Sequence, residues 1–271
     1  MRYASVAGQF YSGTEAALLK ELEDCFNHEL GPGKVPELNK SGERRIRGIV
    51  SPHAGFMYSG PIAAHGFAAL AEDGFPDVFV ILGPNHHGLG SGVAITTHDF
   101  ETPLGTMQND KELARKIRTG IVDDSMLAHR HEHSIEVQLP FIQFFARDRK
   151  FVPVSMLMQD HKSATQVGKS VRDAIGDRDA VIIASTDFSH YISPEAAKEK
   201  DMLAIDRILD LDTKGLYDTV RKNRITMCGF GPVIAMLEAV QGSEAELLKY
   251  ANSGDVKPMA EVVGYASIVV R

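Results

Sequence analysis

Short apolar runs rich in β-branched residues alternate along the chain with longer segments of helical periodicity. We expect strands at Ile46–Ser51, Asp77–Gly83, Phe151–Met158 and Asp179–Ser185, and two of these runs contain the continuously apolar sequences FVIL and VIIA. Continuous apolarity is typical of parallel strands that are covered on both faces. Helical patterns lie between or after these strands, at residues 60–72, 109–119, 133–147, 162–175, 194–210 and 229–241.

This alternation of strands and helices predicts an α/β fold. The chain shows no internal repeat and no long linker, so we expect residues 1–271 to form one layered domain. Its central sheet should be mostly parallel or mixed, and helices should flank it on both faces.

The two ends of the chain each add one element to this pattern. Ser12 and Glu15 have the spacing of a capping box, and leucines then recur at helical spacing as far as Phe26. A Gly-Pro pair ends this helix and opens a surface connection over residues 31–45. The segment Val262–Val270 reads as a last strand, either at an edge or antiparallel.

Charge and composition narrow the classes of partner. Lys and Arg number 29 against 36 Asp and Glu, so the formal net charge is −7 with neutral histidines. This balance argues against a nucleic-acid partner, because phosphate binding needs clustered cations. No apolar run reaches the ~18–20 residues of a membrane span, and the first residues do not resemble a signal peptide. We therefore expect a soluble, cytoplasmic protein with no membrane or nucleic-acid partner.

Polar side chains gather just beyond three of the predicted strands. His53 follows the first strand, His86 and His87 follow the second, and Asp187 and His190 follow the last of the four. Ligands of open α/β sheets bind at the carboxyl ends of the strands, so we expect these three turns to form one site. Adjacent residues in extended backbone point in opposite directions, and spacing alone leaves the choice between the two neighbouring histidines open.

The segment HRHEHSIEVQLPFIQFF, residues 129–145, carries three further histidines ahead of a helical pattern. We interpret His129 and His131 as surface loop residues. His133 is a candidate catalytic or supporting group of the shared site.

The helix that follows has several features of a helix start. Ser134 is a candidate cap, and Glu132 and Glu136 suit the positively polarised N-terminus. Pro140 should kink the helix or mark a restart.

The two cysteines have different surroundings, and two cysteines exclude a disulfide-stapled scaffold. Cys228 precedes a Gly-Phe-Gly-Pro turn at the expected start of a helix, a position that lowers a thiol pKa and favours thiolate. Cys25 lies within the first amphipathic helix, and we interpret it as a small buried apolar residue.

These residues together predict a metal site. His53, one of His86 and His87, and Cys228 would offer two imidazoles and a thiolate, a set that suits zinc, iron or copper and disfavours magnesium and calcium. Three protein ligands leave a coordination position open, as in catalytic sites. The sequence contains neither a phosphate-binding glycine loop, nor a Gly-x-Ser-x-Gly serine hydrolase motif, nor a His-Glu-x-x-His zinc helix.

Three polar residues remain as candidate acid–base groups of this site. His190 or His133 could take a proton from a substrate near neutral pH. Asp187 could orient a metal-ligating imidazole or the ring of His190.

An ordered series of motifs then resembles that of the Memo family, and its prokaryotic branch in particular. The motifs run over nearly the whole chain, from about residue 7 to the C-terminal strand, and read AGQFY, VSPHAGFMYSG, LGPNHHG, EHSIEVQLPF, STDFSHY and CGFGP. The resemblance implies a fold similar to the class III extradiol dioxygenases of the LigB type. It also implies metal ligands at His53, His86 and Cys228, and pocket positions at Asp187, His190 and His133.

The implied ligands differ from those of the dioxygenases, which hold iron with two histidines and a glutamate. Cysteine in the third place makes iron more electron-rich and tolerates copper. We therefore expect an oxidoreductase with iron(II) as the favoured ion, copper as an allowed one and zinc as a less favoured one, acting on a small-molecule substrate.

Two alternatives use the same pocket. The first is a non-catalytic module that binds a peptide or another ligand or handles a metal, because some Memo relatives resemble phosphotyrosine-peptide adaptors. The second is a zinc-dependent hydrolase. Prokaryotic relatives are often linked with radical SAM proteins, which implies a radical SAM protein as a possible partner.

Overall fold

Four parallel strands form the centre of an 11-stranded mixed sheet in the computed structural model, which describes all 271 residues. They lie in the order β1 (Gly48–Ser51), β8 (Ala180–Ser185), β2 (Val78–Pro84) and β7 (Lys150–Met156). All four coincide with predicted strands to within a few residues, and every residue of β1, β2 and β8 is buried. Burial on both faces accounts for their continuous apolar sequences.

Antiparallel strands extend the parallel centre on both sides. β11 (Val262–Val270) pairs antiparallel with β1 and with β10 (Ala245–Asn252), so the predicted last strand is antiparallel and lies inside the sheet. On the other side, β3 (Val93–Ile95) pairs antiparallel with β7. The remaining strands are the short β4 (Phe100–Thr102), β5 (Gly105–Asn109), β6 (Asp123–Asp124) and β9 (His190–Ile192). The predicted α/β fold with a mixed central sheet is therefore confirmed.

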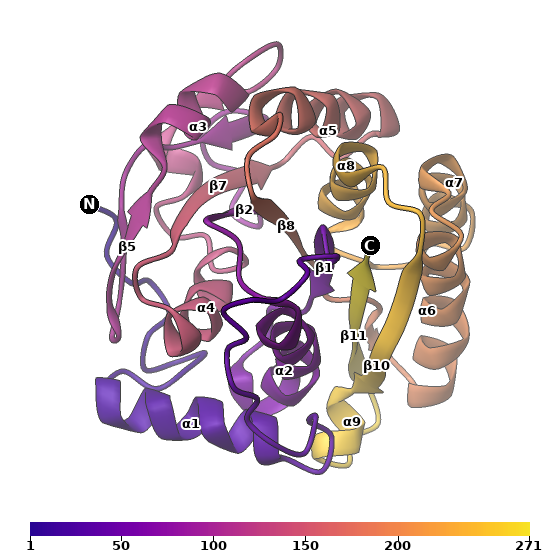
Figure 1. Cartoon of the computed structure of the whole chain (residues 1–271). Helices are drawn as coiled ribbons and strands as arrows, with labels where there is room; N and C mark the ends of the chain where they lie inside the picture. The colour runs from indigo at the N-terminus through magenta and orange to yellow at the C-terminus, as the bar shows by residue number, and fades with distance from the viewer.

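Helices cover both faces of this sheet (Figure 1). One face packs against α1 (Glu15–Asn27), α2 (Phe56–Asp73) and α4 (Leu139–Phe145). The other packs against α3 (Lys111–Ile117), α5 (His161–Ile175), α6 (Pro194–Leu209), α7 (Thr213–Lys222) and α8 (Phe230–Val240). A short helix, α9 (Ser253–Val256), contacts β10 and β11.

Alternation along a strand divides the core between the two faces. In β2, Val78, Val80 and Leu82 belong to a cluster of 36 buried residues on the α5 and α8 side. Phe79 and Ile81 belong to a cluster of 30 buried residues on the α1, α2 and α4 side. Successive side chains of a strand point to opposite faces, so β2 contributes to both clusters and holds the two helix layers together.

Two predicted helix starts are wrong in detail. Thr14, rather than Ser12, precedes α1, and its side chain makes no capping hydrogen bond. The Ser12 backbone N–H instead donates to a carboxylate oxygen of Glu21 at 2.6 Å, because the chain turns before the helix begins.

The predicted helix over residues 133–147 forms as a 3₁₀ turn at Glu136–Gln138 followed by α4. Ser134 does not cap it, since its hydroxyl donates to the Pro84 carbonyl at 3.0 Å. Pro140 stands in the first turn of α4, where a backbone N–H would have no acceptor within the helix, so its absence in proline costs nothing. The predicted restart of the helix at Pro140 is confirmed.

Several elements have no clear sequence signal. The short strands β3 to β6 and β9 have two to five residues each, too few for a periodicity to stand out. β10 is half-exposed along most of its length, and α7 has only two fully buried residues. None of the helices is both long enough and apolar enough to cross a lipid bilayer.

Candidate metal centre

The carboxyl ends of β1, β8 and β2 lie next to one another in register. Ser51 at the end of β1 pairs with Ser185 at the end of β8, and Leu82 of β2 pairs with Ala184. The turns that follow these strands are therefore neighbours, as the sequence predicted.

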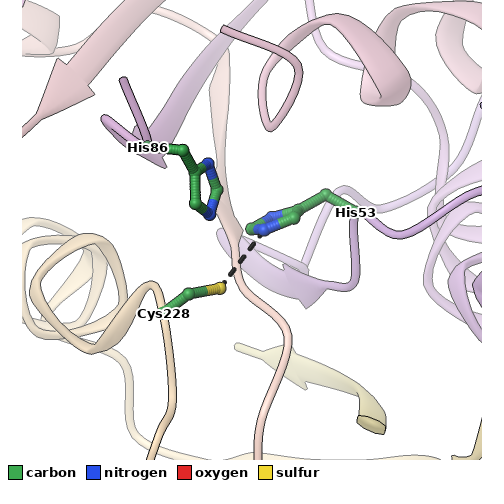
Figure 2. Close-up of side chains that lie close together, drawn as sticks. All are labelled: His53, His86 and Cys228. Atoms are coloured by element: carbon green, nitrogen blue, oxygen red, sulfur yellow. Dashed lines mark hydrogen bonds between the residues drawn. The ribbon is translucent and has the colours of Figure 1, made fainter. Parts of the chain in front are cut away.

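These turns bring His53 and His86 together with Cys228, which reaches the site from the turn before α8 (Figure 2). One ligand atom of each residue lies within 4.8 Å of the other two. The closest pair is His53 Nε2 and Cys228 Sγ at 3.2 Å. Cys228 is held in place by the turn after β8, because its Sγ accepts the Asp187 N–H at 3.2 Å and its own N–H donates to the Asp187 carbonyl at 3.2 Å.

The hydrogen-bond network defines the tautomer of His53. Its Nδ1 lies 2.9 Å from the Ser185 hydroxyl, which donates its only proton to the Ser134 carbonyl at 2.6 Å. The same hydroxyl accepts from the Gln138 side-chain amide at 2.9 Å. Because the hydroxyl proton is already used, Nδ1 of His53 must carry the proton in its bond to Ser185. The lone pair of Nε2 then faces Cys228.

His86 adopts the same Nδ1–H tautomer as His53, with a different hydrogen-bond partner. Its Nδ1 lies 2.9 Å from Oε1 of Glu132, and its backbone N–H donates to Oε2 at 2.6 Å. An ionised carboxylate only accepts, so Nδ1 carries the proton and Nε2 presents a lone pair to the site. Burial alone would raise the pKa of the Glu132 carboxyl, but the hydrogen bonds that it accepts from His86 and from the Ser134 backbone, together with the nearby imidazoles, outweigh burial and lower this pKa to about 2.

The neighbouring histidine points elsewhere. His87 is exposed, and its ring lies 6.2 Å from that of His131, which is exposed as well. The geometry thus places His86 at the cluster and His87 outside it, which the spacing of the sequence left open.

The protonation expected for Cys228 is wrong for the protein without a cation. Burial, together with the negative charge of Asp187, raises the pKa of the Cys228 thiol. Two backbone N–H groups and the Thr186 hydroxyl near the sulfur lower this pKa by less than these effects raise it. The position before α8 therefore does not by itself produce a thiolate, and binding of a cation would have to release the thiol proton.

The three candidate acid–base residues occupy different parts of the site. The ring of His133 stacks on that of His86 at 4.6 Å and lies 5.4 Å from that of His53. Burial lowers the pKa of His133 to about 4, so this ring is neutral at pH 7. Asp187 is 4% exposed, and its carboxylate accepts the His53 backbone N–H at 2.7 Å.

His190 stands at the edge of the cluster and is partly exposed. Its Nδ1 lies 2.9 Å from the Thr226 carbonyl, which only accepts, so the proton is on Nδ1 and Nε2 is free to accept one. The expected link from Asp187 to the His190 ring is not made, because Thr226 holds the ring instead. Asp187 orients the His53 main chain.

Several contributing residues were missed by sequence reasoning. Glu132 was interpreted as a helix-dipole charge, whereas it is 2% exposed and holds His86. Ser185 and Gln138 lie within apolar segments, and a buried polar residue there was the only available signal.

The interpretation of His129 as a surface residue is wrong. It is 1% exposed, and its Nε2 lies 3.1 Å from the Ala94 carbonyl. The chain packs the 129–136 segment between the sheet and residues 2–11, which the local pattern did not show.

Comparisons with known proteins agree with this arrangement of motifs. The family model described as "Memo-like protein" matches residues 2–269. A MEMO1 family protein of Methanopyrus kandleri is 49% identical, over 100% of this chain and 99% of its own length. Relatives of the same description in Methanothermobacter thermautotrophicus and Sulfurisphaera tokodaii are 47% and 42% identical, each over at least 98% of both chains.

A solved structure supports the fold independently. The crystal structure of the uncharacterized protein JW3007 from Escherichia coli K12 is similar to this chain with a TM-score of 0.55 and 14% sequence identity. The match covers 84% of this chain and 100% of that one, and at this identity it bears on the fold alone. From the family model and the full-length relatives, the chain belongs to the Memo family.

Proposed function

We propose that this protein is an oxidoreductase that depends on a single metal ion held by His53, His86 and Cys228. The observation that carries the proposal is the direction of the protons. Both imidazoles donate Nδ1–H to buried acceptors, and both Nε2 lone pairs point to the site, where that of His53 lies 3.2 Å from the Cys228 sulfur. Metal-binding histidines are held in this way by a second hydrogen bond that fixes tautomer and orientation.

The chemistry of the donors favours particular ions. Two nitrogens and one sulfur suit iron, copper or zinc and disfavour magnesium and calcium. Three protein donors leave at least one position for a substrate, as in catalytic sites. The resemblance to the LigB-type dioxygenases favours iron(II), the sulfur donor tolerates copper, and zinc ranks third. A redox-active ion at this site would supply electron transfer and polarise a bound substrate.

The residues around the three donors fit acid–base work on such a substrate. The free Nε2 of His190 is at the exposed edge, where it can accept a proton from a substrate hydroxyl. The neutral His133 ring, stacked on His86, can hydrogen-bond to the substrate. The Asp187 carboxylate accepts the backbone N–H of His53, and the backbone N–H of Asp187 donates to the Cys228 sulfur. Asp187 therefore maintains the distance between the donors His53 and Cys228.

Metal analysis and oxygen consumption together test the proposal. The protein is purified without air, its metals are measured, and iron(II) or copper(I) is then added to metal-free protein. We expect about one ion per chain in the wild type and in His87→Ala, and a loss of binding in His53→Ala and His86→Ala. With catechols and other small organic substrates, we expect substrate-dependent oxygen uptake that falls about 100-fold in His190→Ala.

Other outcomes would support the alternative functions instead. Stoichiometric metal binding with no oxygen uptake for any substrate would overturn the oxidoreductase proposal and favour a metal-handling module. Peptide affinity that survives loss of all three donors would indicate a binding module, with a radical SAM protein as one partner to assay. Ester or amide hydrolysis by the zinc-loaded protein alone would indicate a hydrolase.

A further inference from the structure

Arg2 is a buried arginine that the proposed reaction does not use. Its side chain is 1% exposed and lies 4.9 Å above the ring of Phe100. Burying a guanidinium is costly unless each of its donors finds an acceptor. The acceptors of the Arg2 guanidinium all lie in one segment, residues 129–136.

The guanidinium contacts this segment at three points. Nε donates to the His129 carbonyl at 3.0 Å, and Nη2 donates to the Glu132 carbonyl at 2.7 Å. Nη1 forms an ion pair with the fully buried Glu136. The planar fork of an arginine presents donors in fixed directions. These contacts therefore fix the course of the backbone on both sides of Glu132.

Glu132 is the residue that holds His86. Its main-chain oxygen is bound by Arg2, while its carboxylate receives both the ring and the backbone N–H of His86. One residue thus links the arginine to a candidate metal donor. A shift of this backbone would move the carboxylate away from Nδ1 of His86.

The same part of the chain touches the turn that carries His53. The Phe10 ring lies 4.7 Å from that of His133, and the Phe10 carbonyl accepts the Phe56 N–H at 2.7 Å. Glu136 accepts N–H groups of Ser5 and Val6 as well as the Tyr11 hydroxyl. Residues 2–11 therefore pack against two of the segments that form the site.

We propose that Arg2 is a positioning residue for the metal centre, acting through Glu132 to keep the proton of His86 on Nδ1 and its Nε2 free for an ion. This inference rests on the proposed function. It concerns the ring of His86, however, so part of it is measurable in the protein without any metal.

The first test is nitrogen NMR of histidine side chains in the metal-free protein, with the His86 signals assigned by their loss in His86→Ala. We expect a single Nδ1–H tautomer of His86 in the wild type. In Arg2→Lys the charge near Glu136 remains but the fork to Glu132 is lost, and we expect a mixture of the two tautomers. Arg178→Lys is the matched control, since Arg178 pairs with the buried Asp110 far from the site.

The second test is titration with cobalt(II), whose visible absorption reports sulfur and nitrogen ligands. We expect Arg2→Lys to weaken binding about 10-fold, the lower end of the loss seen when a support of a metal ligand is removed. In a Glu132→Gln background the same change should have no further effect, because the two residues act along one path.

These measurements distinguish a general loss of stability in Arg2→Lys from a loss of the position of the His86 ring. If Arg2→Lys melts earlier but keeps the wild-type His86 tautomer and cobalt affinity, the proposal is overturned. Should Arg2→Lys fail to fold, the double variant Arg2→Met with Glu136→Gln removes both buried charges together, and the same mixture of tautomers is expected. A wild type that shows the expected tautomer but binds no cobalt would contradict the proposed function and leave the link from Arg2 to His86 standing.

Discussion

His53 and His86 present the same nitrogen to the site although their supports differ. A hydroxyl whose proton is already donated holds one ring, and a buried carboxylate holds the other. The carboxylate adds negative charge next to one imidazole only, which makes His86 the stronger donor of the two. At the scale of single residues, the site is thus defined by where protons lie, and this depends on partners distant in sequence.

Substitution of Cys228 tests the sulfur donor. Cys228→Ser replaces a soft donor by a hard one with nearly the same shape, so we expect the affinity for iron(II) or copper(I) to fall by at least about 100-fold. Cys25→Ser is the matched control, because Cys25 is 5% exposed in α1 and its sulfur packs near Gly60. It should bind metal like the wild type while losing about 1 kcal/mol of stability. Equal affinities in the two variants would remove Cys228 from the donor set.

Substitution of Glu132 tests the support of His86. Glu132→Gln keeps the size of the side chain but loses its charge. The amide has one oxygen in place of two, so it cannot accept the ring N–H and the backbone N–H of His86 at separate oxygens. We expect metal affinity to fall about 10-fold, as for other supports of metal ligands. Glu112→Gln, a surface change on α3, should leave the affinity unchanged. Isothermal titration of both variants measures the difference, and a wild-type value for Glu132→Gln would contradict the role given to this carboxylate.

At the scale of elements, the turn after β2 depends on a close approach to residues 134–135. Gly83 lies in β2, and a Cβ built there would stand 2.4 Å from Ser134 Oγ and 2.9 Å from Ile135 Cγ1. The absence of a side chain at this position lets the strand that leads to His86 lie against the segment that carries Glu132. An exposed strand end would tolerate alanine, so the glycine is explained by packing.

Gly83→Ala should separate these two elements. We expect a loss of about 1–3 kcal/mol in the free energy of unfolding, the usual cost of overpacking a buried position, together with weaker metal binding. Gly55→Ala is a suitable control, since its Cβ would meet the Phe10 carbonyl oxygen at 3.5 Å, an ordinary contact. Urea unfolding of both variants provides the comparison, and similar losses in the two would refute the close-approach argument.

At the scale of the whole molecule, the sheet carries a helix layer on each face (Figure 1). The candidate site lies at the carboxyl ends of the sheet's central strands. The folded protein therefore buries several polar groups at one end of the sheet. His129 is among them, with its Nε2 paired to Ala94 and its Nδ1 buried without a partner. Burial therefore disfavours a second proton on this ring.

His129 should make the folded protein sensitive to acid. Burial lowers its pKa from 6.5 to about 4, so the unfolded chain binds a proton at higher pH than the folded one. The stability from neutral His129 is present above pH 6.5 and is lost as the pH falls toward 4, by about 3 kcal/mol in total. Urea unfolding at pH 7, 6, 5 and 4 should show a steeper decline for the wild type than for His129→Gln. Parallel declines would show that another group is responsible.

The sequence predicted the central strands correctly because their apolar runs reflect burial on both faces. This property is visible in each segment without knowledge of its neighbours in space. The sequence also indicated His53, His86 and Cys228, partly through strand ends and partly through the order of the Memo motifs. Capping failed at Ser12 and Ser134, because their polar groups are used by residues 9 and 50 positions away. Local patterns do not contain such partners.

The amino-acid sequence by itself thus determined the α/β class, the strands of the parallel centre and the family of the protein. The choice of His86 over His87 followed from the order of the Memo motifs and agrees with the geometry. Only the tertiary structure decided that His129 and Glu132 are buried and that Thr226 rather than Asp187 holds His190. The physical reason is that periodicity records how each segment meets the solvent. The position of a proton depends on acceptors that only folding brings within hydrogen-bond distance.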